Sequence, residues 1–370
     1  MGRREMVRLG ALTKIKTGKL DANASSSDGE YPFFTCSVKP LRISSYSYNC
    51  ECVLVAGNGD LNVKYYNGKF DAYQRTYIIE SINKNVLFVP YLFRFLERYV
   101  VVLRTMTSGG VIQYIKLGNL TDAKIPLPPL EVQRKIAETL DAASELLAMR
   151  KNQLAELDKL IQSVFYDMFG DPVTNEKGWE VRKLGEICNK ITDGKHGDCE
   201  DDYNSGFYFI SAKDVNNGRI NYETSRQITQ KDFLDANKRT SLSNGDLIVV
   251  NTGATIGKTA LISAEEVDKN TTFQKSVAII SVNTTYIYNT FLYRYIIINR
   301  DEIYKDASGS AQKNWLLSQM RNYKIILPPL SLQTQFAETV QKIEEQKALV
   351  QKAIDETQAL FDSLMNEYFE

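Results

Sequence analysis

The sequence is poor in the residues on which most active sites and metal sites depend. It contains one histidine, His196, among 370 residues, and a single histidine cannot supply an ordinary Ser-His-Asp triad or a histidine-rich metal site. The five cysteines are irregularly spaced. Cys50 and Cys52 lie one residue apart, but no second Cys/His pair at finger-like spacing completes a tetrahedral zinc site. We therefore expect reduced, partly buried thiols and no bound metal.

Long apolar runs and an excess of one charge are also missing. No apolar stretch approaches the roughly 18–20 residues that a membrane span needs, and the start, Met1 to Glu5, does not have the composition of a signal peptide. We therefore expect a cytoplasmic protein with no membrane partner. Basic and acidic residues both number 45, whereas DNA-binding proteins usually carry a basic excess. Local patches count more than the total, because a subunit of a complex can share phosphate contacts with its partners.

An internal repeat organises the chain. Residues 108–139 align without gaps on residues 308–339, and thirteen of the 32 positions are identical. Both copies contain Leu-Pro-Pro-Leu, at 127–130 and at 327–330, and a glutamine follows three residues later in each. A chain of this length is also too long for one ordinary hydrophobic core. We therefore expect two related modules.

Two shorter anchors extend the alignment upstream. Leu9–Gly10 corresponds to Leu184–Gly185, and we align Gln74–Arg75 with Gln274–Lys275. Between the anchors the two halves differ in sequence and in length. This pattern is typical of variable modules on constant connectors.

A long helix is predicted after each Leu-Pro-Pro-Leu, because proline ends the preceding strand or loop and lets a helix begin just beyond it. Apolar residues then recur at alternating four- and three-residue steps for about five heptads, which predicts a coiled-coil seam on helices of roughly 50–55 Å. Arg150 breaks the first series, and Lys347 and Thr357 break the second. Such residues either fix the register of the helices or extend from the seam edge into solvent. The seam positions are Ile136, Leu140, Leu147, Arg150, Leu154, Leu157, Ile161, Phe336, Val340, Ile343, Lys347, Val350, Ile354 and Phe361.

The modules themselves mix strand-like and helix-like segments. Short β-branched runs bounded by Gly, Asn and Asp predict strands at 52–56, 77–79, 247–250 and 277–280. Helices are expected to begin near Tyr91 and Thr290. Strict βαβ alternation is missing, so we predict an α+β fold, not a doubly wound sheet.

The segment Gly253–Thr259 is similar to a phosphate-binding loop. The true motif needs four residues between its glycines, and this one has three. A glycine-rich hairpin or loop is the better interpretation, with Lys258 near a phosphate. A nucleotide-dependent enzyme using this loop stays as an alternative. Methyltransferase and dinucleotide-binding signatures are also missing, so we expect a binding protein without catalytic activity.

The order module, helix, module, helix resembles the specificity subunits of type I restriction–modification systems. The resemblance covers essentially the whole chain and includes Phe-Gly-Asp-Pro at 169–172, after the first helix, and the module segments 181–187 and 252–258. It implies two mixed α/β target-recognition domains joined by two long helices that form an antiparallel coiled coil. The implied division is domain 1 at 1–128, first spacer helix at 129–170, domain 2 at 171–328 with a linker at 171–178, and second spacer helix at 329–370.

The resemblance also implies a function. Each domain would read one half of a bipartite, asymmetric site in double-stranded DNA, and the helices would set the spacer between half-sites. The helices would dock two modification subunits, which bind S-adenosylmethionine and methylate adenine, and a restriction subunit would join them. This chain would hold no cofactor and have no catalytic role. The specificity chain of another DNA-modification system is the alternative.

Candidate DNA-binding residues are polar and basic side chains expected on module loops, because Arg, Lys, Asn and Gln read base edges and contact phosphates. Those of the first module are Lys19, Asn58, Asn62, Lys64, Gln74, Arg75, Arg104 and Gln113. Those of the second are Lys195, His196, Lys213, Arg226, Asn251, Lys258, Gln274, Lys275, Lys313 and Asn314. We favour the aligned pairs Arg75/Lys275 and Gln113/Lys313, because both members of each lie beside variable or glycine-rich loops.

Overall fold

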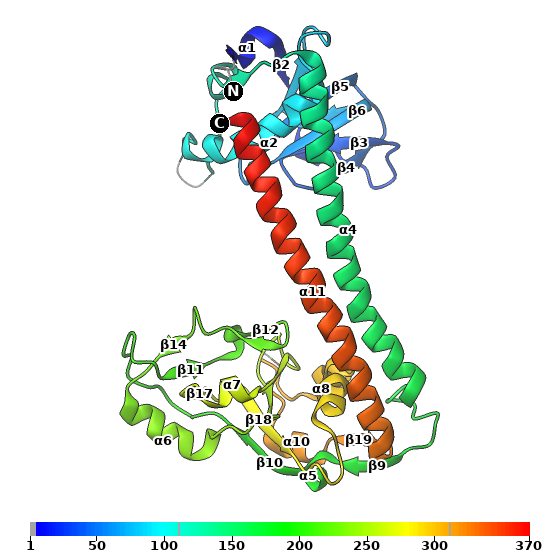
Figure 1. The fold of residues 1–370 in the computed structure, drawn as a ribbon, viewed down its shortest axis with the longest axis vertical. Helices are drawn as coiled ribbons and strands as arrows, with labels where there is room; N and C mark the ends of the chain where they lie inside the picture. The colour runs from blue at the N-terminus through cyan, green and yellow to red at the C-terminus, as the bar shows by residue number, and fades with distance from the viewer. Residues whose placement is uncertain (1–4, 110–111, 311) are drawn as a thin grey trace. The chain divides into compact units, whose positions relative to one another are not determined.

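The computed structural model describes residues 5–109, 112–310 and 312–370. The chain forms two compact units, Met1–Gln153 with Val350–Glu370, and Leu154–Leu349. Each unit combines helices with sheets, which confirms the predicted α+β class (Figure 1). Two 40-residue helices, α4 (Leu130–Phe169) and α11 (Leu330–Phe369), contribute one part to each unit.

The first unit contains a six-stranded sheet in the order β2-β7-β5-β6-β3-β4, and a separate pair formed by β1 and β8. Its strands are β1 (Met6–Arg8), β2 (Thr13–Thr17), β3 (Tyr31–Phe34), β4 (Leu41–Ile43), β5 (Tyr48–Ala56), β6 (Val63–Ala72), β7 (Thr76–Ser81) and β8 (Lys124–Pro126). Its short helices are α1 (Leu9–Leu12), the 3-10 turn Ala22–Ala24, α2 (Val89–Thr105) and α3 (Leu117–Thr121). The strands and the helix predicted for this module lie in β5, β7 and α2.

The second unit repeats this plan with a divided sheet. Its main sheets have the orders β10-β18-β15-β16 and β14-β11-β17, and β9 pairs with β19 as β1 pairs with β8. Its strands are β9 (Glu180–Lys183), β10 (Cys188–Asp193), β11 (Tyr208–Ile210), β12 (Val215–Asn216), β13 (Arg219–Ile220), β14 (Arg226–Gln227), β15 (Leu247–Val250), β16 (Thr259–Leu261), β17 (Thr271–Phe273), β18 (Val277–Val282) and β19 (Lys324–Leu327). Its helices are α5 (Leu184–Ile187), the 3-10 turn Ala212–Asp214, α6 (Gln230–Thr240), α7 (Ala264–Val267), α8 (Asn289–Ile298), α9 (Arg300–Asp306) and α10 (Leu317–Asn322).

A buried glutamine joins each long helix to its module. Gln133, on the first turn of α4, is 0% exposed. Its Oε1 accepts from the Phe88 amide at 2.9 Å, and its Nε2 donates to the carbonyls of Val86 and Pro128, both at 2.8 Å. These bonds hold the start of α2 and the Pro-Pro segment against the helix. Because the buried Gln133 side chain lies against these partly buried backbone groups, its amide supplies their hydrogen-bond partners in place of water.

Gln333 makes the equivalent three hydrogen bonds in the second unit and is also 0% exposed. We call each such set of bonds a bracket. Its Oε1 accepts from the Tyr288 amide at 2.8 Å, and its Nε2 donates to Pro328 at 2.8 Å and to Tyr286 at 3.3 Å. The glutamine that follows each Leu-Pro-Pro-Leu therefore has the same structural role twice.

The polar residues of the predicted seam form bonds between α4 and α11. The Arg150 guanidinium donates to the Ala353 carbonyl and to the Thr357 hydroxyl in the first unit. In the second unit, the Lys347 ammonium lies 2.6 Å from the Asp158 carboxylate. The earlier residue of α4, Arg150, contacts the later part of α11, and the later residue, Asp158, contacts the earlier part. The two helices therefore run antiparallel where they pack. These contacts favour the interpretation that polar seam residues fix register.

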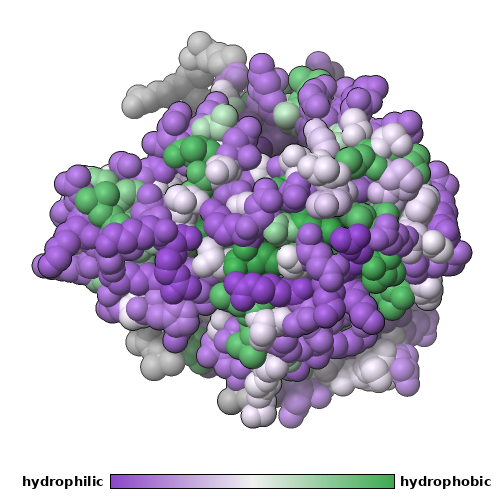
Figure 2. Space-filling view, turned by 90° about the horizontal axis from the view of Figure 1, so that it is seen from below, coloured by the Kyte–Doolittle hydropathy of each residue, from purple (hydrophilic) through white to green (hydrophobic). Residues whose placement is uncertain are grey.

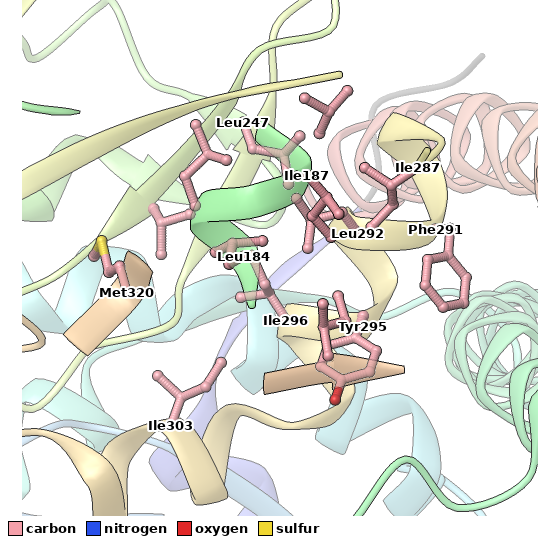
Figure 3. Close-up of a cluster of buried hydrophobic side chains, with 14 of the residues drawn as sticks. Leu184, Ile187, Leu247, Ile287, Phe291, Leu292, Tyr295, Ile296, Ile303 and Met320 are labelled. Atoms are coloured by element: carbon pink, nitrogen blue, oxygen red, sulfur yellow. The ribbon is translucent and has the colours of Figure 1, made fainter. Parts of the chain in front are cut away.

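Each unit has its own main core. In the first, α2, the sheet and the long helices enclose a cluster that includes Leu92, Leu140 and Phe369. In the second, α5, α8 and α10 bring Leu184, Leu292 and other apolar side chains together (Figure 3). Seam residues take part in both clusters, so the helices belong to the module cores as well as to each other.

Two features bear on membranes and metals. In the described part of the chain, no helix combines the length and the apolar character needed to cross a bilayer. The five cysteines are free thiols.

Candidate nucleic-acid interface

One turn of the first unit lies at the meeting point of three chain segments. The turn between β6 and β7 places the Arg75 carbonyl 2.8 Å from the Gly57 amide. The Gly57 carbonyl in turn accepts from the Ile115 amide at 2.9 Å, and the Gly18 amide donates to the Thr76 carbonyl at 3.0 Å. The end of β2, the loop after β5 and the loop before α3 therefore surround this turn.

The second unit has the same backbone arrangement at the turn between β17 and β18. The Asn251 amide donates to the Ser276 carbonyl at 3.0 Å, and the Asn251 carbonyl accepts from the Trp315 amide at 2.7 Å. The Gly194 amide donates to the Val277 carbonyl at 3.0 Å. The two modules thus share one set of backbone hydrogen bonds around the turn, which we call the frame. The side chains on this frame differ between the modules.

The backbone hydrogen bonds of the frame show that the predicted alignment of the two turns was shifted by one residue. Arg75 corresponds to Ser276, and Gln74 corresponds to Lys275, whose amides donate to Leu20 at 2.9 Å and to Lys195 at 3.1 Å. The aligned pair Arg75/Lys275 was therefore wrong. The predicted alignment paired Gln74 with Gln274 because both are glutamine. Identity at one position does not determine the register of the strands beside it.

The other favoured pair agrees with the backbone. The Gly59 amide donates to the Gln113 carbonyl at 3.0 Å, and the Gly253 amide donates to the Lys313 carbonyl at 2.8 Å. Gln113 and Lys313 therefore occupy equivalent places.

Two glycines of the frame, Gly18 and Gly194, were not predicted from the sequence. A Cβ on Gly18 would lie 2.1 Å from the Ala72 carbonyl oxygen, and one on Gly194 would lie 2.1 Å from that of Phe273. Only glycine permits this close approach of two backbones. The sequence feature that could have indicated them is a Gly-Lys pair directly after β2 and directly after β10, at 18–19 and 194–195.

The candidate side chains fall into two groups, those that other protein groups hold and those that are free. Within the described residues, seven candidate side chains make no hydrogen bond or ion pair with protein. These free candidates are Lys19, Asn58, Gln74, Arg75, Lys213, Gln274 and Lys275. Most lie at the two equivalent turns, and Lys19, Gln74, Arg75, Lys213 and Lys275 are exposed. Free donors on an exposed turn can bind phosphates or base edges.

In the first unit, protein partners hold the remaining candidates. The Asn62 amide donates to Cys36 and Asp60 carbonyls at 2.7 and 2.9 Å, and Lys64 donates to Asn62. Burial lowers the pKa of Lys64. Arg104 pairs with Asp60 at 3.1 Å, and Gln113 accepts from the Thr107 hydroxyl at 2.6 Å.

Carboxylates hold three candidates of the second unit. Burial alone would lower the pKa of Lys195, but hydrogen bonds to Asp232 and Asp235, at 3.1 and 3.3 Å, outweigh it and raise the pKa. Hydrogen bonds to Asp198 and Asp201 raise the pKa of Arg226. His196 lies 2.9 Å from the Asp193 carboxylate. Reaching DNA would require these residues to exchange a protein partner for a phosphate.

The last group of candidates supports the loops of the second unit. Asn251 is 3% exposed, and its Oδ1 accepts from the Thr252 hydroxyl at 3.2 Å. Lys258 donates to Asn216 at 2.7 Å, Lys313 donates to the Ala307 carbonyl at 2.7 Å, and Asn314 accepts from Thr252 at 3.3 Å. Asn251 has no surface to offer a base, so we leave it out of the proposed contacts.

The glycine-rich segment 253–259 joins two antiparallel strands, β15 and β16. A phosphate-binding loop instead leads from a strand into a helix, whose N-terminus holds the phosphates. The local structure therefore contradicts the phosphate-loop alternative and agrees with the predicted hairpin.

The sequence matches the family model of the type I restriction modification DNA specificity domain at residues 2–159 and 176–358. The chain belongs to this family of specificity subunits. It is 42% identical over 156 residues to the EcoDI specificity subunit of Escherichia coli, a match that covers 42% of the chain and 34% of that protein. It is 24% identical over 390 residues to the MjaVIII specificity subunit of Methanocaldococcus jannaschii, covering 98% of the chain and 91% of that protein.

Solved structures of specificity subunits have the same fold. The S subunit of a type I system from M. genitalium matches with a TM-score of 0.61 at 16% identity, over 100% of this chain and 97% of that one. A chain from a structural study of complex assembly and conformational transition in the type I system matches with a TM-score of 0.59 at 18% identity, over 100% and 98%. The family explains the duplicated modules and paired helices of this specificity subunit.

Proposed function

We propose that this specificity subunit reads a bipartite, asymmetric site in double-stranded DNA, one half-site with each module, and has no catalytic role of its own. The observation that carries the proposal is the frame at the two turns, which is the same in backbone and different in side chains. A common frame presents both modules to DNA in the same manner, and different side chains let them prefer different bases. The domain limits 1–128 and 171–328 stay predictions.

Partner subunits would dock on the long helices. In the first unit Leu146 and Met149 of α4 are exposed, as are Leu160 of α4 and Leu349 of α11 in the second. Figure 2, which shows the molecule from below, has a few apolar patches on a largely hydrophilic face. Exposed apolar side chains that lie next to one another are typical of surfaces that bind another protein, and Leu146 and Met149 are three residues apart on α4. We propose two modification subunits as the partners, with a restriction subunit joining them in the cytoplasm.

The cofactor would then lie on the partners. We propose that S-adenosylmethionine binds the modification subunits, and that this subunit directs them to adenines beside its site.

Genome-wide mapping of methyladenine, with and without this gene, tests the proposal. We expect one split motif to lose its methylation when the gene is deleted. An unchanged methylation map in a strain with an active locus would rule out the function. Neighbouring genes for a separate methyltransferase and a helicase-nuclease distinguish the type I assignment from another modification system.

Arg75 provides a direct test of the proposed interface. Arg75→Ala should weaken DNA binding by the assembled methyltransferase about tenfold, because one cationic contact is lost, and should leave assembly intact, because Arg75 is exposed and free. Electrophoretic mobility shifts at physiological salt measure the affinity, and size-exclusion chromatography checks assembly. Arg104→Ala, which removes a guanidinium paired with Asp60, is the matched control and should have the smaller effect. Unchanged affinity of Arg75→Ala would count against the interface.

A further inference from the structure

The two modules differ chemically at the turn between β6 and β7 and at the turn between β17 and β18, where their backbones make equivalent hydrogen bonds. In the first unit the turn presents the side chains of Gln74 and Arg75, which are exposed and make no hydrogen bond or ion pair within the described chain. In the second unit the equivalent positions are Lys275 and Ser276. The guanidinium of the first module therefore has no counterpart, and the cation of the second lies one residue earlier in the turn.

The surroundings of the two turns differ in the same direction. A pocket of about 290 Å³ lies beside Arg75, lined by Thr17, Gly57, Gln74, Arg75, Tyr77 and Ile115. At the places of Gly57 and Ile115, the second unit has the buried side chains of Asn251 and Trp315. The pocket gives the planar guanidinium of Arg75 room to turn.

The chemistry of Arg75 selects among bases. Guanidinium only donates hydrogen bonds, through a planar fork. Guanine presents two adjacent acceptors, N7 and O6, in the major groove, whereas adenine presents an acceptor beside a donor. Arginine also forms bidentate pairs with phosphates. At this turn the Gly57 amide already donates to the Arg75 carbonyl at 2.8 Å and adds no donor for a phosphate, so the test must separate a base contact from a phosphate contact. Lys275 carries a compact point charge without a planar fork, as do other lysines that bind phosphates.

We propose that Arg75 is a specificity-determining residue that reads a guanine in the half-site of the first module, and that Lys275 at the second turn contacts a phosphate and reads no base. The inference rests on the proposed function and adds to it a named base and an asymmetry. The half-site of the first module must contain a G·C pair that Arg75 recognises, and removal of Lys275 must affect all sequences alike.

The test uses the assembled methyltransferase and the split motif found by methylation mapping. Each guanine of the motif is replaced in turn by 7-deazaguanine, which lacks the N7 acceptor. We expect one guanine at which this replacement weakens wild-type binding about tenfold and hardly weakens binding by Arg75→Ala. Arg75→Lys keeps the charge but loses the planar fork, so its penalty at that guanine should be smaller than that of the wild type while its affinity stays above that of Arg75→Ala.

Lys275→Ala is the matched control at the second turn. It should weaken binding to all duplexes by a similar factor and reduce the salt dependence of the affinity, as expected for a phosphate contact. Uniform weakening by Arg75→Ala with every 7-deazaguanine penalty preserved would overturn the inference, and would leave DNA reading by the subunit in place. Loss of sensitivity at one guanine in Lys275→Ala would overturn the asymmetry. Failure of the proposed function itself would appear earlier, as a methylation map without a motif that depends on this gene.

Discussion

Replacing Gln133 by leucine should lower the free energy of unfolding of the first unit by about 3 kcal/mol or more. The side chain is fully buried and satisfies the Phe88 amide and the carbonyls of Val86 and Pro128. Leucine fills similar space but leaves three partly buried groups without this partner, and an unsatisfied buried polar group costs roughly 1–3 kcal/mol, with the lower end expected where water reaches the group. Urea unfolding measures the change. Hydrogen exchange at the Phe88 amide shows whether the bracket itself has opened.

The exposed Gln153, on the same helix, provides the control. Gln153→Leu should change stability by less than about 0.5 kcal/mol, as is usual for a surface substitution. Gln333→Leu should reproduce the Gln133→Leu loss in the second unit, with faster exchange at the Tyr288 amide. Equal stability of Gln133→Leu and Gln153→Leu would refute a structural role for the bracket.

Replacing Phe165 by alanine should destabilise the second unit by about 3 to 5 kcal/mol, the range for removal of a buried phenylalanine. The Phe165 ring is fully buried on α4. Its centroid lies 5.1 Å from that of Phe169, 5.7 Å from Phe291 on α8 and 5.6 Å from Phe336 on α11. One ring therefore joins both long helices to the module core, and its loss leaves a cavity where three elements meet.

The neighbouring Tyr166 separates this packing effect from a general effect on the helix. Tyr166 is 38% exposed, so Tyr166→Ala makes the same kind of truncation on the same helix without opening a core cavity. Chemical unfolding followed by circular dichroism should show a much larger shift of the midpoint for Phe165→Ala. Similar shifts for the two variants would contradict the central position of Phe165.

The architecture was predictable where its causes are local. Leu-Pro-Pro-Leu at 127–130 and 327–330 marks the start of each helix, because proline restricts the backbone wherever it occurs. Heptad spacing predicted the seam. Arg150 and Thr357 interrupt the apolar series of their helices, but the periodicity of one helix does not reveal which of its polar residues contact the other helix.

The candidate interface was predictable only as a set of residue types. Arg226 and Arg75 look alike in sequence, yet Asp198 and Asp201 hold Arg226 through the packing of distant segments, while Arg75 is free. Asn251 is a polar residue in a predicted loop, yet its side chain is buried. These outcomes depend on which carboxylates and carbonyls the fold brings near, and a list of side chains does not contain that information.

By itself the sequence determined the duplication, the order of modules and helices, the helix starts and the α+β class, because repeats, proline and periodicity act within short stretches of chain. Only the tertiary structure decided that Arg75 corresponds to Ser276, that Gln133 and Gln333 are buried brackets, and that a few of the candidate side chains at the two turns are free to bind. The physical reason is that strand register, burial and ion pairing join residues far apart in the chain, and folding decides which of them meet.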